Sequence, residues 1–268
     1  MDILFLLKLV ILFIIGGGTI ALLSFIAEKS STKLAGVILS FPSTIVISFI
    51  FLAYTNSIDT VIQVAPTAFI PLGVGLIFPI IYIYTARFLN KLNIPKILEV
   101  SGSFLISTIF WLVISIPLAE IHFSNIIFGI IGYFVLLTLA QIILEKEKNE
   151  TPPLVTYSTT QKIARASFIG SIVVLMAILS KFISPFWGSI FSVFPAGVGS
   201  LLMIFHLQYS PANLSGLVQK LPIGSLLIFI YIISVLYFFP IYGVILGTLF
   251  SYTLSSMGYM VIKKLLKV

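Results

Sequence analysis

The continuous apolar runs constrain this chain most, and the run Lys33–Thr55 is the most informative of them. It is long enough to cross a bilayer, because a transmembrane helix needs about 20 apolar residues. Phe41-Pro42 stands near its middle. A second run, Phe186–His206, carries Phe194-Pro195 at the corresponding place. We interpret the two runs as matching parts of one pseudo-symmetric membrane protein.

The composition excludes a soluble fold. Charged residues make up 9% of the 268-residue chain and hydrophobic residues 59%, whereas a soluble domain carries about 25% charged residues. The runs are continuously apolar and do not alternate as β-barrel strands do. They predict an all-α, polytopic helical membrane protein. In such a protein the net charge of +7 reports orientation, so no nucleic-acid partner is expected.

The 20-residue rule predicts about nine transmembrane spans. In chain order they cover roughly residues 4–27, 34–54, 62–86, 97–118, 124–144, 163–183, 186–207, 214–238 and 241–262. The longest polar segment, Glu145–Gln161, is charged, then Pro-rich, then rich in Ser and Thr, which is typical of a linker. The predicted domains are a first four-span repeat (1–119), an inverting fifth span with the linker (120–161), and a second four-span repeat (162–268).

Basic residues predict the orientation of the chain. Most of the 15 Lys and Arg residues fall on the side of the predicted spans that holds the C-terminus. By the positive-inside rule the C-terminus is then cytoplasmic and the N-terminus outside, in a multi-pass protein of the plasma or inner membrane. Lys181 lies on the outer side, and Lys8 can reach it from the first span.

The chain shows an internal repeat when residue i is set against residue i + 152, with small insertions. A four-span repeat has an even number of spans, so the additional fifth span turns the second copy upside down. Inverted repeats of this kind recur among transporters. The matches are Gly18-Thr19-Ile20 with Gly170-Ser171-Ile172, Lys29 with Lys181, Gly36 with Gly188, Phe41-Pro42 with Phe194-Pro195, and Gln63 with Gln219.

The first half also resembles the GlpM-like family of small inner-membrane proteins. The residues that carry the resemblance are Lys33-Leu34-Ala35-Gly36, Phe41-Pro42 and Ile70-Pro71. The second half keeps Gly188 and Phe194-Pro195 but has Trp187 in place of the alanine. The resemblance implies units of about four spans, here fused through an inverting span, and a link to envelope polysaccharide production.

The two mid-span prolines are the leading candidates for a functional feature. A proline leaves a helical carbonyl unpaired, and in lipid that carbonyl must be satisfied by neighbouring helices, hydroxyls or a water-lined cavity. The two kinked helices can flank a midplane substrate pathway, or they can merely shape packing while the hydroxyls bond to their own helix. The candidate pathway residues near them are Ser40, Phe41, Pro42, Ser43, Thr44, Ser192, Phe194 and Pro195.

Four further polar residues belong to the candidate pathway. Gln63 and Gln219 each precede a proline by three residues, and they are either polar gates or helix-entry caps. Lys220 either reaches the cytoplasmic surface or lines an anion-attracting vestibule, because a charge within a span is costly unless it meets water or a partner. Glu99 lies near the cytoplasmic start of the fourth span, as a partner for a basic residue or as part of a proton relay.

No catalytic motif is present, so an enzyme is not expected, and neither is a metal or cofactor. His122 and His206 fall at span ends on opposite sides and do not predict one metal site. The sequence favours a transporter or channel for a small solute or lipid-linked group, with its pathway between the inverted halves. The alternative is a non-transporting accessory protein of an envelope-building complex. The expected partners are the lipid bilayer and, in a possible homodimer, a second copy of the chain. A transporter would in addition bind a small-molecule substrate.

Overall fold

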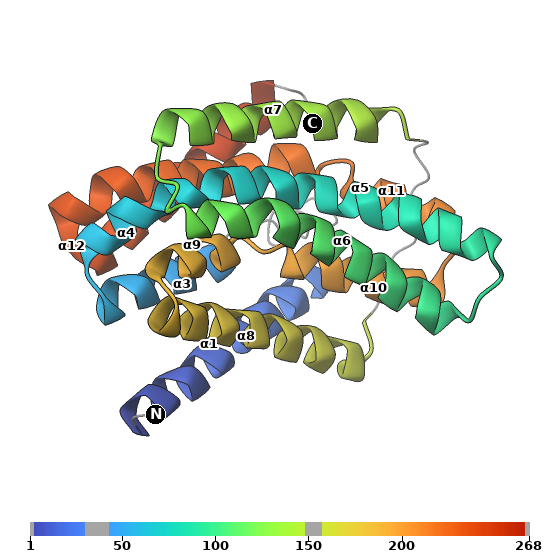
Figure 1. The fold of residues 1–268 in the computed structure, drawn as a ribbon, viewed down its shortest axis with the longest axis horizontal. Coiled ribbons are helices and arrows are strands. Elements are labelled where there is room, and N and C mark those ends of the chain that lie inside the picture. Colours follow the sequence, from blue (N-terminus) through green and yellow to red (C-terminus); the bar gives the residue numbers. More distant parts are fainter. Residues whose placement is uncertain (1–2, 30–42, 148–156, 266–268) are drawn as a thin grey trace.

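The computed structural model describes residues 3–29, 43–147 and 157–265, and every regular element within these ranges is a helix. Helix α5 (Phe69–Lys91) runs through the middle of the molecule (Figure 1). It is buried along most of its length by its neighbours α6 (Lys96–Glu120) and α7 (Ile126–Glu145). Those two helices keep large apolar side chains exposed, as lipid-facing helices do.

Within the described residues, five helices are long and apolar enough to cross a membrane. A sixth is added when α9 (Pro185–Ser192) and α10 (Ala196–Gln208) are counted as one span bent by 42°. This fits the predicted all-α, multi-pass membrane protein. The count of nine spans and the inverted-repeat layout stay predictions.

Helices α1 (Ile3–Lys29) and α8 (Thr159–Phe182) cross in close contact, and glycines make the approach possible. A Cβ atom added to Gly17 would lie 2.7 Å from the carbonyl oxygen of Ala166, and one added to Gly170 would lie 2.9 Å from that of Phe13. Residues 13 and 17 stand 153 positions before residues 166 and 170. At this spacing the contact is the same in both directions, and it pairs Gly17 with Gly170, one residue away from the predicted match of Gly18 with Gly170.

Prolines divide several runs into shorter helices, because proline has no N–H group to donate to the preceding turn. The bend between α9 and α10 falls at Pro195, and a short 3-10 helix, η1 (Ala65–Ala68), begins one residue before Pro66. The remaining short elements are α3 (Ser43–Thr55), α4 (Ile58–Val64), η2 (Pro211–Leu214) and α11 (Ser215–Val218).

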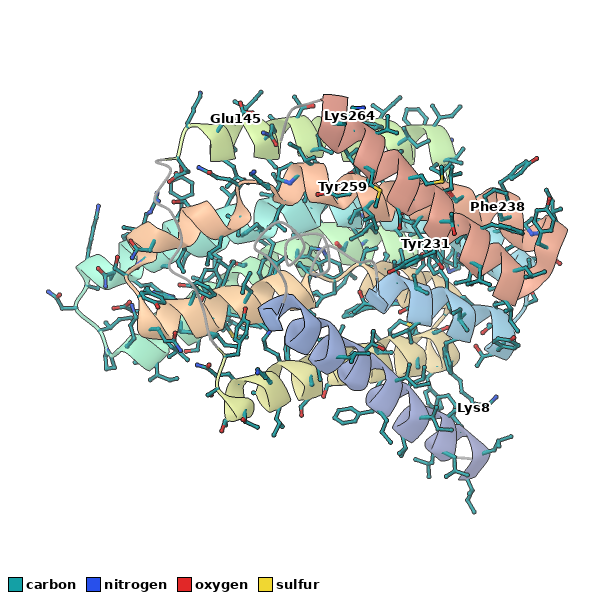
Figure 2. The ribbon with its side chains drawn as sticks, turned by 180° about the vertical axis from the view of Figure 1, so that it is seen from behind. Lys8, Glu145, Tyr231, Phe238, Tyr259 and Lys264 are labelled. Carbon is teal, nitrogen blue, oxygen red and sulfur yellow. The ribbon has the colours of Figure 1, made fainter. Side chains whose placement is uncertain are left out.

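Helix α12 (Leu221–Leu265) is a hairpin of two antiparallel arms (Figure 1). The chain reverses at Gly243, whose φ of 72° is readily adopted only by glycine. The Ser255 hydroxyl donates to the Leu227 carbonyl oxygen across the arms at 2.6 Å. Figure 2 shows the arms from behind, with Phe238 near the turn and Lys264 toward the end of the returning arm. The reversal falls close to the predicted boundary between the spans 214–238 and 241–262.

The two ends of the bundle are each held by side-chain contacts between helices. At the N-terminal end, where α1 starts and α8 stops, the Trp187 indole N–H donates to Glu120 at 3.0 Å. At the opposite end, the linker end, α7 stops and α8 starts. There the Arg87 guanidinium forms a two-pronged ion pair with Glu147, Nη1 donating to Oε1 at 3.1 Å and Nη2 donating to Oε2.

The α1–α8 crossing predicts opposite effects for two adjacent glycines. Gly17→Ala places a methyl group against the Ala166 backbone and should lower the free energy of unfolding by about 1 to 3 kcal/mol. Gly18→Ala is the matched control, because its Cβ meets nothing within 4 Å. Alanine should leave stability unchanged there, or raise it through helix propensity. Thermal unfolding of both variants in detergent tests this; equal melting temperatures would contradict the crossing.

The Arg87–Glu147 pair predicts an acid-sensitive contribution to stability. The hydrogen bond from Arg87 holds the pKa of the Glu147 carboxyl below its ordinary value of 4.5. The contribution is therefore complete above that ordinary value and is lost as the pH falls through the lower, folded-state pKa. We expect the melting temperature to be higher for wild type than for Glu147→Gln at neutral pH. The difference should shrink in acid; a difference that stays constant down to pH values well below 4.5 argues against the pair.

Candidate functional site

Of the candidate pathway residues around the first Phe-Pro pair, Ser40, Phe41 and Pro42 lie outside the described residues, as does the side chain of Ser43. Thr44 is half-buried on α3. Among the described residues α3 covers Ser43–Thr55, and α10 covers Ala196–Gln208, directly after Pro195.

The second Phe-Pro pair lies in a close-packed aromatic cluster at the bend between α9 and α10. The ring of Phe194 lies 5.0 Å from that of Trp111 and 6.3 Å from that of Phe78, centroid to centroid. The buried Ser192 hydroxyl donates to the carbonyl oxygen of Ser189 in its own helix at 2.5 Å. The broken helix predicted at Pro195 is present, but no polar passage is seen beside it among the described residues.

The two glutamines lie at different ends of the bundle and do not form one gate. Gln63 is exposed on α4. The Gln219 amide donates to the carbonyl oxygen of Glu147 at 3.1 Å, just beyond the end of α7. Gln219 thus caps the C-terminal end of α7, a neighbouring helix, rather than the entry of its own helix. Lys220 beside it is exposed at the linker end.

Glu99 is the centre of a buried polar cluster at the linker end. Its carboxylate accepts hydrogen bonds from Lys96 Nζ at 3.1 Å and from Asn90 Nδ2 at 3.2 Å. The Nε2 atom of His206 lies 3.3 Å from Glu99 Oε2. The other ring nitrogen, Nδ1, lies 3.2 Å from the Tyr82 hydroxyl. The cluster joins α5, α6 and α10, and it links a partly exposed lysine to a fully buried tyrosine.

Sequence reasoning missed two members of the polar interior. His206 was placed at a span end, yet it is completely buried against α5 and α6. Arg165 is one of the basic residues that the sequence places on the same side as the C-terminus, yet only 6% of it is exposed. Its Nε donates to Ser200 at 3.3 Å, and its guanidinium lies 5.0 Å from the centre of the Tyr157 ring. No sequence signal identifies these burials, because each depends on which helix lies opposite.

A pocket of about 320 Å³ lies at the N-terminal end. Its walls come from the start of α1, the end of α3, the end of α8 and the start of α9. Figure 2 shows Lys8, one of its lining residues, near the free end of α1. The lining residues with polar or charged groups that matter below are Lys8, Thr55, Asn56, Ser180, Lys181 and Ser184.

The lining of this pocket is basic and includes hydroxyl groups without hydrogen-bond partners among the described residues. Lys8 and Lys181 are exposed, and neither pairs with a carboxylate in the part of the chain that the structure describes. The Lys181 ammonium lies 3.8 Å from the centre of the Phe5 ring. The hydroxyls of Ser180 and Ser184 are buried and have no hydrogen-bond partner among the described residues. Such groups attract a ligand that carries negative charge and hydrogen-bond acceptors.

No family model, curated protein or solved structure matches the chain. The resemblance to GlpM-like proteins therefore stays a prediction. Among the described residues, no group of three or more His, Cys, Asp or Glu side chains is arranged to hold a metal ion.

The Glu99 cluster predicts a stability effect of a single buried carboxylate. Glu99→Gln removes the charge that accepts from Lys96 and Asn90, and it should lower the free energy of unfolding by about 1 to 3 kcal/mol. Asp59→Asn, at an exposed position of α4, is the control and should change stability by about 0.5 kcal/mol or less. Thermal unfolding in detergent measures the stability of both variants. A melting temperature of Glu99→Gln equal to that of wild type would show that the cluster does not stabilise the fold.

Proposed function

We propose that the chain is a membrane transporter or channel for a small solute or lipid-linked group. It would have nine spans, arranged as two inverted four-span halves (1–119 and 162–268) joined by an inverting span, with the pathway between the halves. The observation that carries the proposal is the pocket at the N-terminal end. Its walls come from α1 and α3 of the first half and from α8 and α9 of the second.

The reciprocal α1–α8 contact supports the inverted repeat. Two copies related by a twofold axis meet through the same residues in each direction, and the contacts Gly17–Ala166 and Gly170–Phe13 have this property. The hairpin of α12 corresponds in order to the antiparallel pair α5 and α6. With that hairpin counted as two spans, a total of nine also requires α1 and α3, whose described apolar stretches, Ile3–Thr19 and Thr44–Thr55, are shorter than a span.

The two ends of the proposed pathway differ in the way that alternating access requires. The N-terminal end, which the positive-inside rule assigns to the outside, is open as far as Ser180. Toward the linker end the proposed pathway is closed by the aromatic cluster at Phe194 and by the contacts of Glu99 and Arg165 with α10. An inverted repeat predicts a second state of similar energy that opens at the linker end.

A non-transporting accessory protein of an envelope-building complex is the second candidate. The close packing of Phe194 against Trp111 and Phe78 favours it. If water never enters this aromatic cluster, the pocket does not continue into a passage across the membrane. The GlpM-like resemblance, with its link to envelope polysaccharide, points the same way. The two candidates differ in one measurable respect: whether water ever reaches the residues beyond the pocket.

Single-cysteine labelling distinguishes the two, because the chain contains no cysteine of its own. Ser180→Cys reports the pocket, and Ser192→Cys and Ser200→Cys report buried positions on either side of the Pro195 break. Ser255→Cys is the matched control, equally buried but enclosed between the arms of α12. Each variant is placed in lipid nanodiscs, which expose both membrane faces, and treated with a charged maleimide.

A pathway should allow Ser192→Cys and Ser200→Cys to react at about 0.1 to 10% of the rate of a freely exposed cysteine, the usual population of a minor open state. Ser180→Cys should react faster, and Ser255→Cys much more slowly than all three. If both deep positions react as slowly as Ser255→Cys while Ser180→Cys reacts, the pocket is a dead end. That result would overturn the transporter in favour of the accessory protein.

A further inference from the structure

We propose that the pocket at the N-terminal end binds a small solute through a carboxylate or phosphate group, held by Lys8 and Lys181 with help from Ser180 and Ser184. The inference rests on the proposed function only in taking this pocket as the mouth of the pathway. The binding itself is a property of the pocket and can be measured without transport.

The charge of the pocket is the first argument. Among the described residues, two ammonium groups line it and no Asp or Glu does. Neither lysine has an ion-pair partner in the described part of the chain, so their field is not neutralised nearby. Charged clefts with low-dielectric walls concentrate ions of the opposite sign.

The position of Lys181 is the second argument. Its ammonium is directed onto the face of Phe5, at 3.8 Å from the ring centre. Phe5 is itself buried and packs edge-on against Phe182, with ring centroids 5.8 Å apart. A cation–π contact fixes the ammonium without consuming its charge. Lys181 is therefore held at the pocket with donors still available.

The unpaired hydroxyls are the third argument. Only 4% of Ser180 is exposed, and neither its hydroxyl nor that of Ser184 has a partner among the described residues. Other buried side-chain atoms of the described residues also lack a partner, including those of Arg165, His206 and Tyr231. Ser180 and Ser184 differ from these in lining the pocket, where an oxyanion is an acceptor for O–H groups.

The size and location of the pocket limit the kinds of ligand that can bind in it. A volume of about 320 Å³ lies at the lower end of the range for small-molecule sites, roughly 300 to 1,000 Å³. This fits a small solute or the headgroup of a lipid. On the proposed orientation the two lysines lie on the outer side, where the positive-inside rule does not call for basic residues. Binding of an anionic ligand explains the presence of these two lysines on the outer side, whereas the positive-inside rule does not.

Binding is tested with the purified full-length chain in a neutral detergent that contains no anionic lipid. The probes are inorganic phosphate and acetate, each compared with chloride at equal ionic strength, and the readout is the rise in melting temperature with ligand concentration. Lys8→Gln/Lys181→Gln should weaken the apparent affinity by about tenfold or more, because charge-assisted hydrogen bonds are among the strongest. Ser180→Ala should weaken it less.

Lys91→Gln/Lys264→Gln is the matched control, since it removes the same charge from exposed positions away from the pocket. It should bind as wild type does. A second arm uses nanodiscs with or without phosphatidylglycerol. If stabilisation by both probes is absent in detergent and only phosphatidylglycerol stabilises wild type, with the effect lost in Lys8→Gln/Lys181→Gln, the same site is shown to take a lipid headgroup.

Equal affinity of phosphate and acetate for wild type and for the pocket variant would overturn the anion site, as would the absence of stabilisation in both arms. Neither result touches the labelling of Ser192→Cys, so the pathway can stand without the anion. Conversely, tight binding together with unlabelled deep cysteines would keep the anion site and remove the transporter.

Discussion

The structure depends on one constraint: in hydrocarbon, every backbone N–H and C=O group must be satisfied within the protein. Several helices of this chain are broken near prolines, and near some of these breaks a side-chain hydroxyl donates a hydrogen bond to a backbone carbonyl oxygen. Ser189 of α9 donates to the Val64 carbonyl oxygen next to the break before α5, at 2.7 Å. The Ser225 hydroxyl donates to the Pro222 carbonyl oxygen at 2.7 Å and meets the Tyr133 hydroxyl from α7. The breaks are therefore also points where separate helices are tied together.

The same constraint explains why the α1–α8 crossing is so close. Hydrophobic burial gives little drive for helices to associate within lipid, so packing distance matters more than apolar area. Small residues at Gly17 and Gly170 let each backbone touch the other. The side chains of Val173 and Phe13 pack against Gly16 and Gly170 at the same crossing, so the two helices contact one another through both backbone and side chains.

The polar interior is distributed unevenly between the two ends. At the linker end, Glu99, His206 and Tyr82 contact one another and bind α10 to α5 and α6. At the N-terminal end, Lys181 and Ser180 face a pocket and have no acidic or hydrogen-bonding partner among the described residues. The linker end thus holds a carboxylate among its basic groups, whereas the described lining of the pocket at the N-terminal end is basic only. This difference is the physical basis of both the proposed transport pathway and the anion site.

The amino-acid sequence by itself determined the membrane class, the approximate helical segments and the break at Pro195. These follow from the length of apolar runs and from the missing N–H of proline, which are local properties. The sequence also predicts that the two halves are related, because Gly and Pro positions repeat along the chain. Only the tertiary structure decided that His206 meets Glu99, that Arg165 is buried, and that Lys8 and Lys181 line one pocket. Those pairings depend on which helix faces come together, and long apolar helices of nearly uniform hydrophobicity do not encode that choice in any local pattern.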